Sequence, residues 1–468
     1  MSIYVPNLKP YAGTKAERIA QAISADIVSG ALSPGQRLPP HRDLAHALRV
    51  TPGTVSRAYG LLARRGVLSG EVGRGSFVRD PSAPDADLSV RPQANGANLA
   101  APRTIDLAVN RQPSPDVQHA LSIALEQLAR DSRALSLMTY LPDGGAYHHR
   151  EAFSTWVGNF GVQCDPGRVI ATAGALHGLY TIFRTLAKPG EAVFVEEFTY
   201  AGFKALASEL QLRLEPLPLD DKGLVPEAIE ERAKHCNARW IYLMPGLQNP
   251  TATSMPLDRR RKFAKLAEKH DLMIVEDGVY DFLSDEKISP IASLLPERTF
   301  YVTSLSKCVA AGLRAGCIVA PDAYVERLAS SIRRMMWMTP PLGLEVATRW
   351  IREGVLEQLL SQQTEEFTER RRMAEVAFDK LKFTAPKAAA FIWLQLSQGV
   401  TSSELIAVAE RNGVTLAPTD AFSVRKNRSK DFLRVSLSAC RTPEELSHAL
   451  NIVAKAADGS LISDIGYY

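Results

Sequence analysis

A single lysine, Lys307, stands just after an apolar run that has the length of a buried strand. The segment around it, TSLSKCVAAGLRAG at 303–316, also carries Ser304, Ser306 and Arg314. In open α/β sheets ligands bind outside the carboxyl ends of strands, so this lysine is expected to face a pocket. The two hydroxyls and the guanidinium are suited to hold a phosphate beside the amine. An amine next to a phosphate site indicates a Schiff base between Lys307 and pyridoxal 5'-phosphate.

Two other predicted strands end in groups that this cofactor requires. Residues 272–283, LMIVEDGVYDFL, carry Asp277 with Tyr280 three positions later, and residues 240–244 lead into a loop that contains Asn249. A carboxylate against the pyridine nitrogen keeps that nitrogen protonated, and donors to the ring hydroxyl tune the imine. We therefore assign Asp277 to the nitrogen, and Asn249 and Tyr280 to the ring hydroxyl.

The segments NPTA, EDGVYDF and SLSKCVAAGLRAG, in this order, resemble the aspartate aminotransferase type (fold type I) of pyridoxal phosphate enzymes. The resemblance extends from about residue 104 to the C-terminus. It implies that the backbone amides of Ala175 and Leu176, at the start of a helix, bind the cofactor phosphate. It also implies that Tyr200 stacks on the pyridine ring.

Two further residues take their expected roles from the same resemblance. Tyr140, in YLPDGGAYHHREAF, matches the tyrosine that reaches the cofactor phosphate of the partner subunit. A site shared in this way implies a homodimer. Arg434, in the otherwise apolar strand FLRVSLS, matches the arginine that binds the α-carboxylate of the substrate.

The N-terminal part, residues 9–79, has the pattern of two short helices followed by a hairpin. Helices are predicted at 41–48 and 53–65, and residues 66–78 have the pattern of two strands with a glycine-rich tip. Two helices joined by a tight turn form a helix-turn-helix, and the hairpin forms a wing.

These segments resemble the winged-helix domain of GntR-type regulators, with a PGxxLP turn at 34–39 and a GxGxFV wing at 73–78. The resemblance implies double-stranded operator DNA as a partner. The sequence departs from it at Pro52 and Gly53, where the family often has an arginine and an asparagine. The residues expected to face the duplex are Arg42, Thr54, Ser56, Arg57 and, at the tip of the wing, Arg74.

The remaining segments complete a multidomain organisation. Residues 80–103 are rich in Pro, Ala, Asn and Gly and are expected to form a linker, long enough to place the DNA-binding domain over a partner subunit. Residues 104–468 alternate strands with helices, which predicts a mainly parallel α/β sheet in a large lobe at about 104–330. A smaller α+β lobe is expected at about 331–468.

Composition limits the remaining alternatives. The 468 residues carry a formal net charge of +4, which permits nucleic-acid binding but does not argue for it. The five dispersed cysteines indicate neither a disulfide framework nor a zinc site. The histidines include the pair His148 and His149 but no metal-binding spacing, so no metal is expected. With no segment typical of a signal peptide or a membrane span, we expect a cytoplasmic protein.

The combination of a GntR-type winged helix with an aminotransferase-like domain is similar to the MocR family of bacterial transcriptional regulators. The resemblance implies that the second domain binds pyridoxal phosphate on Lys307 and senses a small amino acid or amine by forming an external aldimine. Closure of the lobes would then bias two dimer states of different operator affinity. Two alternatives remain: a working aminotransferase that carries a DNA-binding domain, and a regulator that senses pyridoxal phosphate itself.

Overall fold

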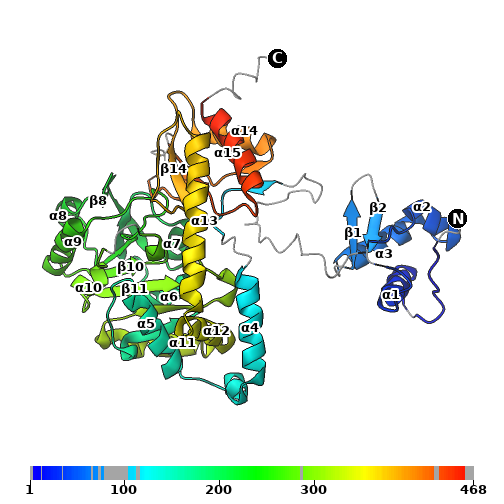
Figure 1. The fold of residues 1–468 in the computed structure, drawn as a ribbon, viewed down its shortest axis with the longest axis horizontal. Coiled ribbons are helices and arrows are strands. Elements are labelled where there is room, and N and C mark those ends of the chain that lie inside the picture. Colours follow the sequence, from blue (N-terminus) through cyan, green and yellow to red (C-terminus); the bar gives the residue numbers. More distant parts are fainter. Residues whose placement is uncertain are drawn as a thin grey trace. The chain divides into compact units, whose positions relative to one another are not determined.

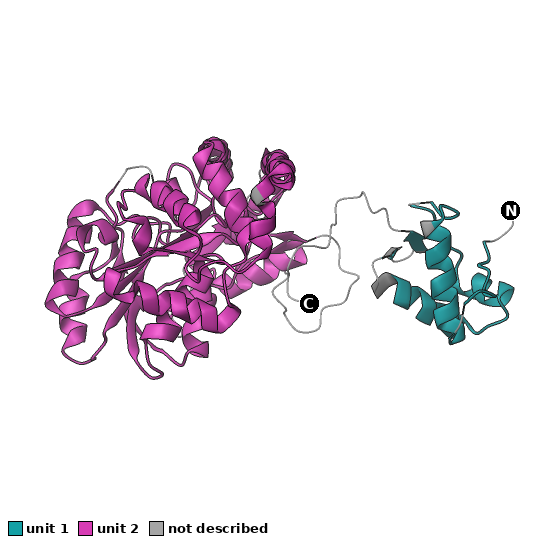
Figure 2. Cartoon of the chain, turned by 90° about the horizontal axis from the view of Figure 1, so that it is seen from below, with its two compact units in different colours: residues 1–102 teal, residues 103–468 magenta. Residues whose placement is uncertain are grey.

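The computed structural model describes residues 4–11, 13–33, 35–64, 67–71, 75–78, 104–111, 116–284, 288–425 and 432–458. The chain divides into two compact units, Met1–Pro102 and Arg103–Tyr468 (Figure 2). Residues 80–103, for which the sequence predicts a linker, lie outside the described residues.

The first unit is a three-helix domain with a two-stranded hairpin. Its apolar core joins all three helices to the hairpin, and Ile19, Leu44 and Val55 in that core are completely buried. The strands pair in antiparallel register, as a wing requires. The predicted winged helix-turn-helix is therefore confirmed. The elements are α1 (Lys15–Val28), α2 (His41–Ala47), α3 (Pro52–Arg64), β1 (Leu68–Glu71) and β2 (Gly75–Val78).

The second unit is built on a seven-stranded sheet (Figure 1). The five strands β11, β10, β9, β5 and β6 run parallel to one another as predicted. The strand β12 is antiparallel to both of its neighbours, β11 and β4. The strands from β9 to β12 are buried along their whole length, which explains their continuous apolar runs. In sheet order the strands are β4 (Val169–Thr172), β12 (Gly316–Val319), β11 (Thr299–Ser304), β10 (Met273–Asp277), β9 (Trp240–Leu243), β5 (Ala192–Glu196) and β6 (Arg213–Leu217).

Helices cover both faces of this sheet. One face packs against α6 (Ala175–Leu186), α7 (Ala201–Glu209) and α11 (Asp322–Met336). The other face packs against two groups of helices, one around α5 and α12 and one around α9. These helices are α4 (Asp116–Arg130), α5 (Tyr147–Gly158), α8 (Glu227–Ala233), α9 (Leu257–Lys269), α10 (Ile291–Leu294) and α12 (Pro341–Arg352). A small hairpin of β7 (Leu219–Asp220) and β8 (Gly223–Leu224) lies between β6 and α8 along the chain.

A smaller lobe has its own sheet and its own core. The strands β13 (Phe383–Thr384), β14 (Phe391–Gln395) and β16 (Phe432–Ser436) pair in antiparallel register. The helices α14 (Ser402–Arg411) and α15 (Pro443–Ala457) contribute to the apolar cluster of this lobe.

The two lobes of the second unit interleave along the chain. The strand β3 (Ile105–Asp106) pairs with β15 (Val414–Thr415), so the start of this unit belongs to the smaller lobe, and α12 packs on the large lobe. The long helix α13 (Val355–Ala377), yellow in Figure 1, contributes to the cores of both lobes. The chain therefore crosses between lobes at several points and not only near residue 330.

Candidate functional site

Lys307 lies directly after β11, where its amine meets the segment that follows β3. Its Nζ donates a hydrogen bond to the backbone carbonyl of Asn110 at 3.2 Å. Burial, reinforced by the positive charges of Arg434 and Arg314, lowers the pKa of Lys307 to about 8. A much larger fraction of this amine is therefore neutral near pH 7 than for an ordinary lysine.

Asp277 is the last residue of β10 and is buried. Its Oδ2 accepts a hydrogen bond from the hydroxyl of Tyr242 at 2.8 Å, and its Oδ1 accepts one from the backbone N–H of Val279 at 3.3 Å. Burial raises the pKa of Asp277 to about 6, although these hydrogen bonds and the charge of Lys307 oppose the shift. The group is a buried anion at neutral pH, which favours a cationic partner.

Tyr280 is joined to the same network through Asn110. The Nδ2 of Asn110 donates to the Tyr280 hydroxyl at 2.8 Å. Within the described residues, the Oδ1 of Asn110 is buried without a hydrogen-bond partner. Asn110 could not be predicted as a site residue, because nothing in its local pattern distinguishes a loop asparagine 197 positions from Lys307.

Arg434 reaches across from the smaller lobe. Its Nη1 donates to Oδ1 of Asn249 at 3.0 Å, its Nη2 donates to the carbonyl of Ala108, and its guanidinium lies 4.6 Å from the centre of the Phe422 ring. Among the described residues Arg434 forms no salt bridge, and its Nε has no hydrogen-bond partner. A buried guanidinium without a salt-bridge partner is costly unless an anion joins it.

The N-terminus of α6 forms the opposite end of the site. Gly174 precedes the helix at φ 89°, and no side chain among the described residues caps Ala175 and Leu176, the first two residues of the helix. A Cβ at Gly174 would lie 2.6 Å from Nη2 of Arg314, so only glycine lets the arginine approach. This arginine donates to the carbonyl of Ala173 at 2.7 Å.

Hydroxyl and imidazole groups surround this helix end. Arg314 donates from Nη1 to Oγ of Ser306 at 3.2 Å, and Oγ of Ser304 accepts from the backbone N–H of Ser306 at 3.4 Å. Nδ1 of His177 accepts from the backbone N–H of Ala173 at 3.0 Å, so its proton is on Nε2. That Nε2 is buried without a partner in the described part of the chain. His177 could not be predicted as a site residue, because a histidine in a first helical turn carries no signal by itself.

The two tyrosines predicted from the family resemblance lie in different environments. Tyr200 is the N-cap of α7, and its pKa is raised by burial and then by Asp277, which places it beside the site. A Cβ at Gly202 would lie 2.4 Å from the Tyr200 ring, so the glycine gives the ring its room. Tyr140 is 77% exposed and packs on Trp337 with ring centres 5.3 Å apart.

In the first unit, the residues expected to face DNA lie on α2 and α3. Arg42 and Arg57 are exposed, whereas Thr54 is half-buried and its hydroxyl lies 2.9 Å from that of Thr51. Oγ of Ser56 is 2.9 Å from Nδ1 of His41, so this serine joins the two helices while staying exposed. Arg74 lies outside the described residues.

Comparison with known proteins assigns both parts of the chain. Residues 102–453 match the model of the aminotransferase class I and II family, and residues 15–78 match that of bacterial regulatory proteins of the gntR family. The chain belongs to the class I and II aminotransferase family. With its gntR-type domain it has the domain combination of the MocR regulators, which confirms the resemblance seen in the sequence.

The relatives that match this chain are of two kinds, regulators and aminotransferases. The chain is 27% identical over 444 residues to the uncharacterized HTH-type transcriptional regulator YdeF of Bacillus subtilis, covering 94% of each chain. It is also 26% identical over 329 residues to aromatic-amino-acid aminotransferase 1 of Thermococcus litoralis, covering 67% of this chain and 78% of the relative. The solved structure of Pyrococcus horikoshii kynurenine aminotransferase has the same fold, with a TM-score of 0.71, 24% identity, and coverage of 78% of this chain and 93% of that one.

The aminotransferase family implies pyridoxal phosphate as cofactor, and the residues of this site fit that group. At one end, the uncapped start of α6 and the unpartnered Nε2 of His177 offer donors to a phosphate. At the other end, the buried carboxylate of Asp277 suits a protonated pyridine nitrogen, and the amine of Lys307 is near it.

Proposed function

We propose that this protein is a transcriptional regulator that binds operator DNA through its winged helix and senses a small amino acid or amine in its aminotransferase-like domain. Lys307 would hold pyridoxal phosphate, which would supply an electrophilic carbon that binds one primary amine at a time, either that of Lys307 or that of the effector. The amino group of the effector would displace the amine of Lys307 from that carbon of the cofactor. A relative named as an HTH-type transcriptional regulator matches this chain over 94% of both sequences, which supports a regulatory role for the whole chain.

The observation that carries this proposal is the state of Arg434. Its guanidinium is buried, has an unpartnered Nε and makes no salt bridge with any described residue. A carboxylate or sulfonate of the effector would supply the missing anion and form a charge-assisted pair. An effector with an amine at one end and an anion at the other would thus take the place of Lys307 with its amine and pair with Arg434 through its anion.

The other residues of the site would position the cofactor. We assign Asp277 to the pyridine nitrogen, and Asn249 and Tyr280 to the ring hydroxyl. Tyr200 would lie against the ring. The phosphate would be held by the amides of Ala175 and Leu176 together with Ser304, Ser306 and Arg314, which are already linked through the hydrogen bonds at the end of α6.

Movement of the smaller lobe offers a physical route from effector to DNA. Arg434 belongs to β16 of that lobe, whereas Lys307 and Asn249 follow strands of the large lobe. An anion bound to Arg434 would compete with Asn249 and Ala108 for the guanidinium, which changes the contacts between the lobes. A ligand that binds one lobe arrangement more tightly shifts the population of dimer states.

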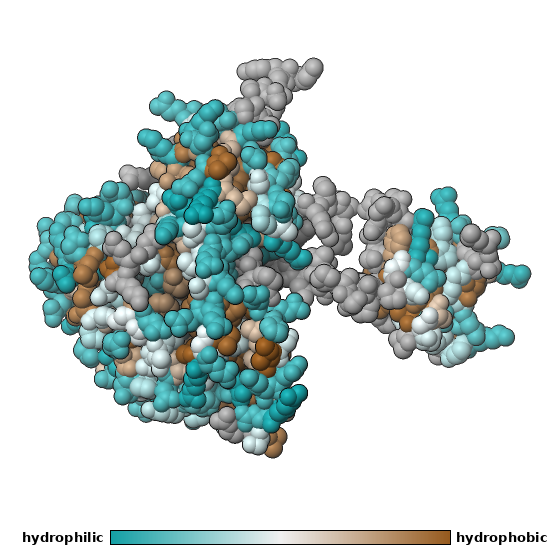
Figure 3. Space-filling view, in the orientation of Figure 1, coloured by the Kyte–Doolittle hydropathy of each residue, from teal (hydrophilic) through white to brown (hydrophobic). Residues whose placement is uncertain are grey.

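A homodimer with a shared site is part of the proposal. Tyr140 would reach the phosphate in the partner subunit, and its large exposure in the single chain supports this role. Several apolar side chains in the same region of the sequence and around Trp337 are also exposed, and they would be covered by the partner. Figure 3 shows one face of the second unit, where hydrophobic patches interrupt a largely hydrophilic surface. The exposed apolar residues of the two segments, around Tyr140 and around Trp337, are Leu135, Met138, Tyr140, Met335, Met336, Trp337 and Leu342.

A second candidate function, amino-group transfer with turnover, is favoured by one observation. Lys307 has both the position and the lowered pKa of a catalytic amine, and Asp277 is ionised beside it. Incubation with an amino acid and a keto-acid acceptor tests this candidate. Sustained formation of a new keto acid would make the protein an enzyme, whereas at most a single turnover per chain supports the sensor.

Binding of full-length protein to its own promoter region tests the proposed function. The protein is loaded with pyridoxal phosphate, and the standard amino acids, γ-aminobutyrate and taurine are added one at a time. We expect one of these compounds to change operator affinity in the wild type and not in Lys307→Ala. An affinity that responds equally in both proteins would contradict the proposal.

A further inference from the structure

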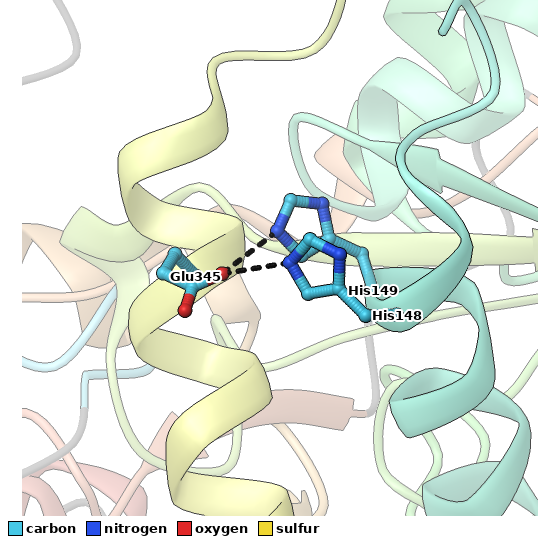
Figure 4. A group of neighbouring side chains, drawn as sticks. All are labelled: His148, His149 and Glu345. Carbon is cyan, nitrogen blue, oxygen red and sulfur yellow. Dashed lines mark hydrogen bonds and ion pairs between the residues drawn. The ribbon is translucent and has the colours of Figure 1, made fainter. Parts of the chain in front are cut away.

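Two histidines and a carboxylate outside the cofactor site converge between α5 and α12 (Figure 4). The Nε2 atoms of His148 and His149 lie 2.9 and 3.2 Å from the same oxygen, Oε2 of Glu345. All three atoms lie within 4.8 Å of one another. None of these residues has a role in the cofactor site described above.

The spacing of these atoms is close to that of a metal coordination shell. With bonds of about 2.0–2.2 Å to a tetrahedral Zn²⁺, neighbouring ligand atoms are separated by roughly 3.3–3.5 Å. The two nitrogen–oxygen distances need only a small opening to reach that value. Two imidazoles and one carboxylate are also a donor set that divalent transition metals prefer.

The surroundings hold the carboxylate of Glu345 in place and bury His149. His149 is completely buried, and the other oxygen of Glu345, Oε1, accepts a hydrogen bond from Nε of Arg349 at 3.1 Å. Arg349 in turn pairs with Asp131 from the segment after α4. A ligating carboxylate that is fixed through its second oxygen is typical of metal sites.

Carboxylates outnumber guanidinium groups around the site, which favours a bound cation. Glu345, Asp131 and Glu151 supply three carboxylates, against two guanidinium groups from Arg349 and Arg352 that pair with them. The side chain of His148 is 40% exposed, which leaves a path for an ion and for a fourth ligand from water.

We propose that His148, His149 and Glu345 bind a divalent transition-metal ion of the Zn²⁺ kind, which fastens α5 to α12. The helix α5 begins just after the segment that carries Tyr140, so the ion would anchor the base of the segment predicted to cross to the partner. Nδ1 of His149 has no hydrogen-bond partner among the described residues. We therefore expect an affinity about 10–100-fold weaker than that of a site with fully oriented histidines.

The test uses full-length protein that is first treated with EDTA and dialysed. Zn²⁺ is then titrated in, with bound metal measured directly and thermal unfolding followed in parallel. The wild type is expected to bind one Zn²⁺ per chain and to unfold at a higher temperature when the Zn²⁺ is bound. His148→Ala and Glu345→Gln are expected to lose both effects.

His448→Ala removes an exposed histidine on α15, far along the chain from the cluster, and serves as the matched control. It is expected to bind Zn²⁺ as the wild type does. Because His148 is partly exposed, His148→Ala keeps the test decisive even if Glu345→Gln does not fold. A wild type that binds no Zn²⁺, or a His148→Ala variant that binds it equally, overturns the proposal.

Discussion

Arg434 and Asn249, 185 positions apart, are joined by a hydrogen bond of 3.0 Å that links the two lobes of the second unit. Arg434 comes from β16 of the smaller lobe, and Asn249 comes from the loop after β9 in the large sheet. The bond places a buried cation against a neutral amide. An anionic ligand can therefore change the contact between the lobes simply by taking one end of this pair.

Replacing Arg434 by lysine should weaken effector binding while the cofactor stays bound. A single ammonium cannot reproduce a bidentate guanidinium pair. Lysine keeps the charge, so the expected cost is that of one lost hydrogen bond to a charged group, about 1.5–3 kcal/mol of binding free energy. Titration of the compound that alters operator affinity measures the change. Arg441→Lys, at an exposed position of the same lobe, is the control, and equal affinities in the two variants would remove Arg434 from the effector site.

The rate at which cofactor-free protein captures pyridoxal phosphate should rise as the pH increases through about 8, the lowered pKa of Lys307. The neutral amine is the nucleophile, and burial makes it available below the range of an ordinary lysine, near about 10.4. Stopped-flow absorbance after mixing gives the rate. Lys307→Ala should show no band of lysine-bound cofactor. A wild-type rate that rises only near pH 10 would contradict the burial of this amine.

Replacing Tyr242 by phenylalanine should raise the pH below which cofactor affinity is lost. In the wild type, affinity should fall as the pH drops through about 6, where Asp277 becomes protonated. The Tyr242 hydroxyl stabilises the ionised carboxylate, so its removal raises the pKa of Asp277. Loss of a hydrogen bond to a charged group is worth about 1.5–3 kcal/mol, or about one to two pKa units. Cofactor affinity measured against pH should shift in this variant and not in Tyr324→Phe.

Replacing Arg57 by alanine should weaken operator binding by about 1–3 kcal/mol if this exposed arginine contacts a base edge. If Arg57 contacts only phosphate, its loss would instead make the plot of log affinity against log salt concentration shallower by about one unit of slope. Fluorescence anisotropy with a labelled operator at several salt concentrations separates the two. Lys15→Ala removes an equal charge at the start of α1. If Arg57→Ala behaves like this control, the recognition helix has been assigned wrongly.

The sequence predicted those parts of the molecule that local patterns determine. Lys307 and Asp277 could be proposed as site residues because each lies at the end of a continuous apolar strand, and the ends of such strands meet at one edge of a sheet. The winged helix was predicted because its turns and helices follow one another within a short segment. The order of the seven strands and the antiparallel β12 depend on long-range pairing, which no local pattern encodes.

The residues that the sequence did not reveal reach their neighbours only through the fold. Asn110 lies 197 positions from Lys307, and Tyr242 has the pattern of a core residue in a buried strand. The same holds for His148 and Glu345, which are also 197 positions apart. No metal was expected from the sequence because adjacent histidines match no metal-binding motif. Their convergence on one carboxylate is a property of the packing of α5 on α12.

The central claim is that occupation of the aminotransferase-like site controls DNA binding. The most direct measurement follows cofactor absorbance and operator binding in the same titration of the loaded full-length protein with amino compounds. We expect one amino acid or amine to shift the absorbance and the operator affinity over the same concentration range, and Arg434→Lys to move both curves together. An absorbance that changes with release of a keto acid, while operator affinity stays constant, would contradict it.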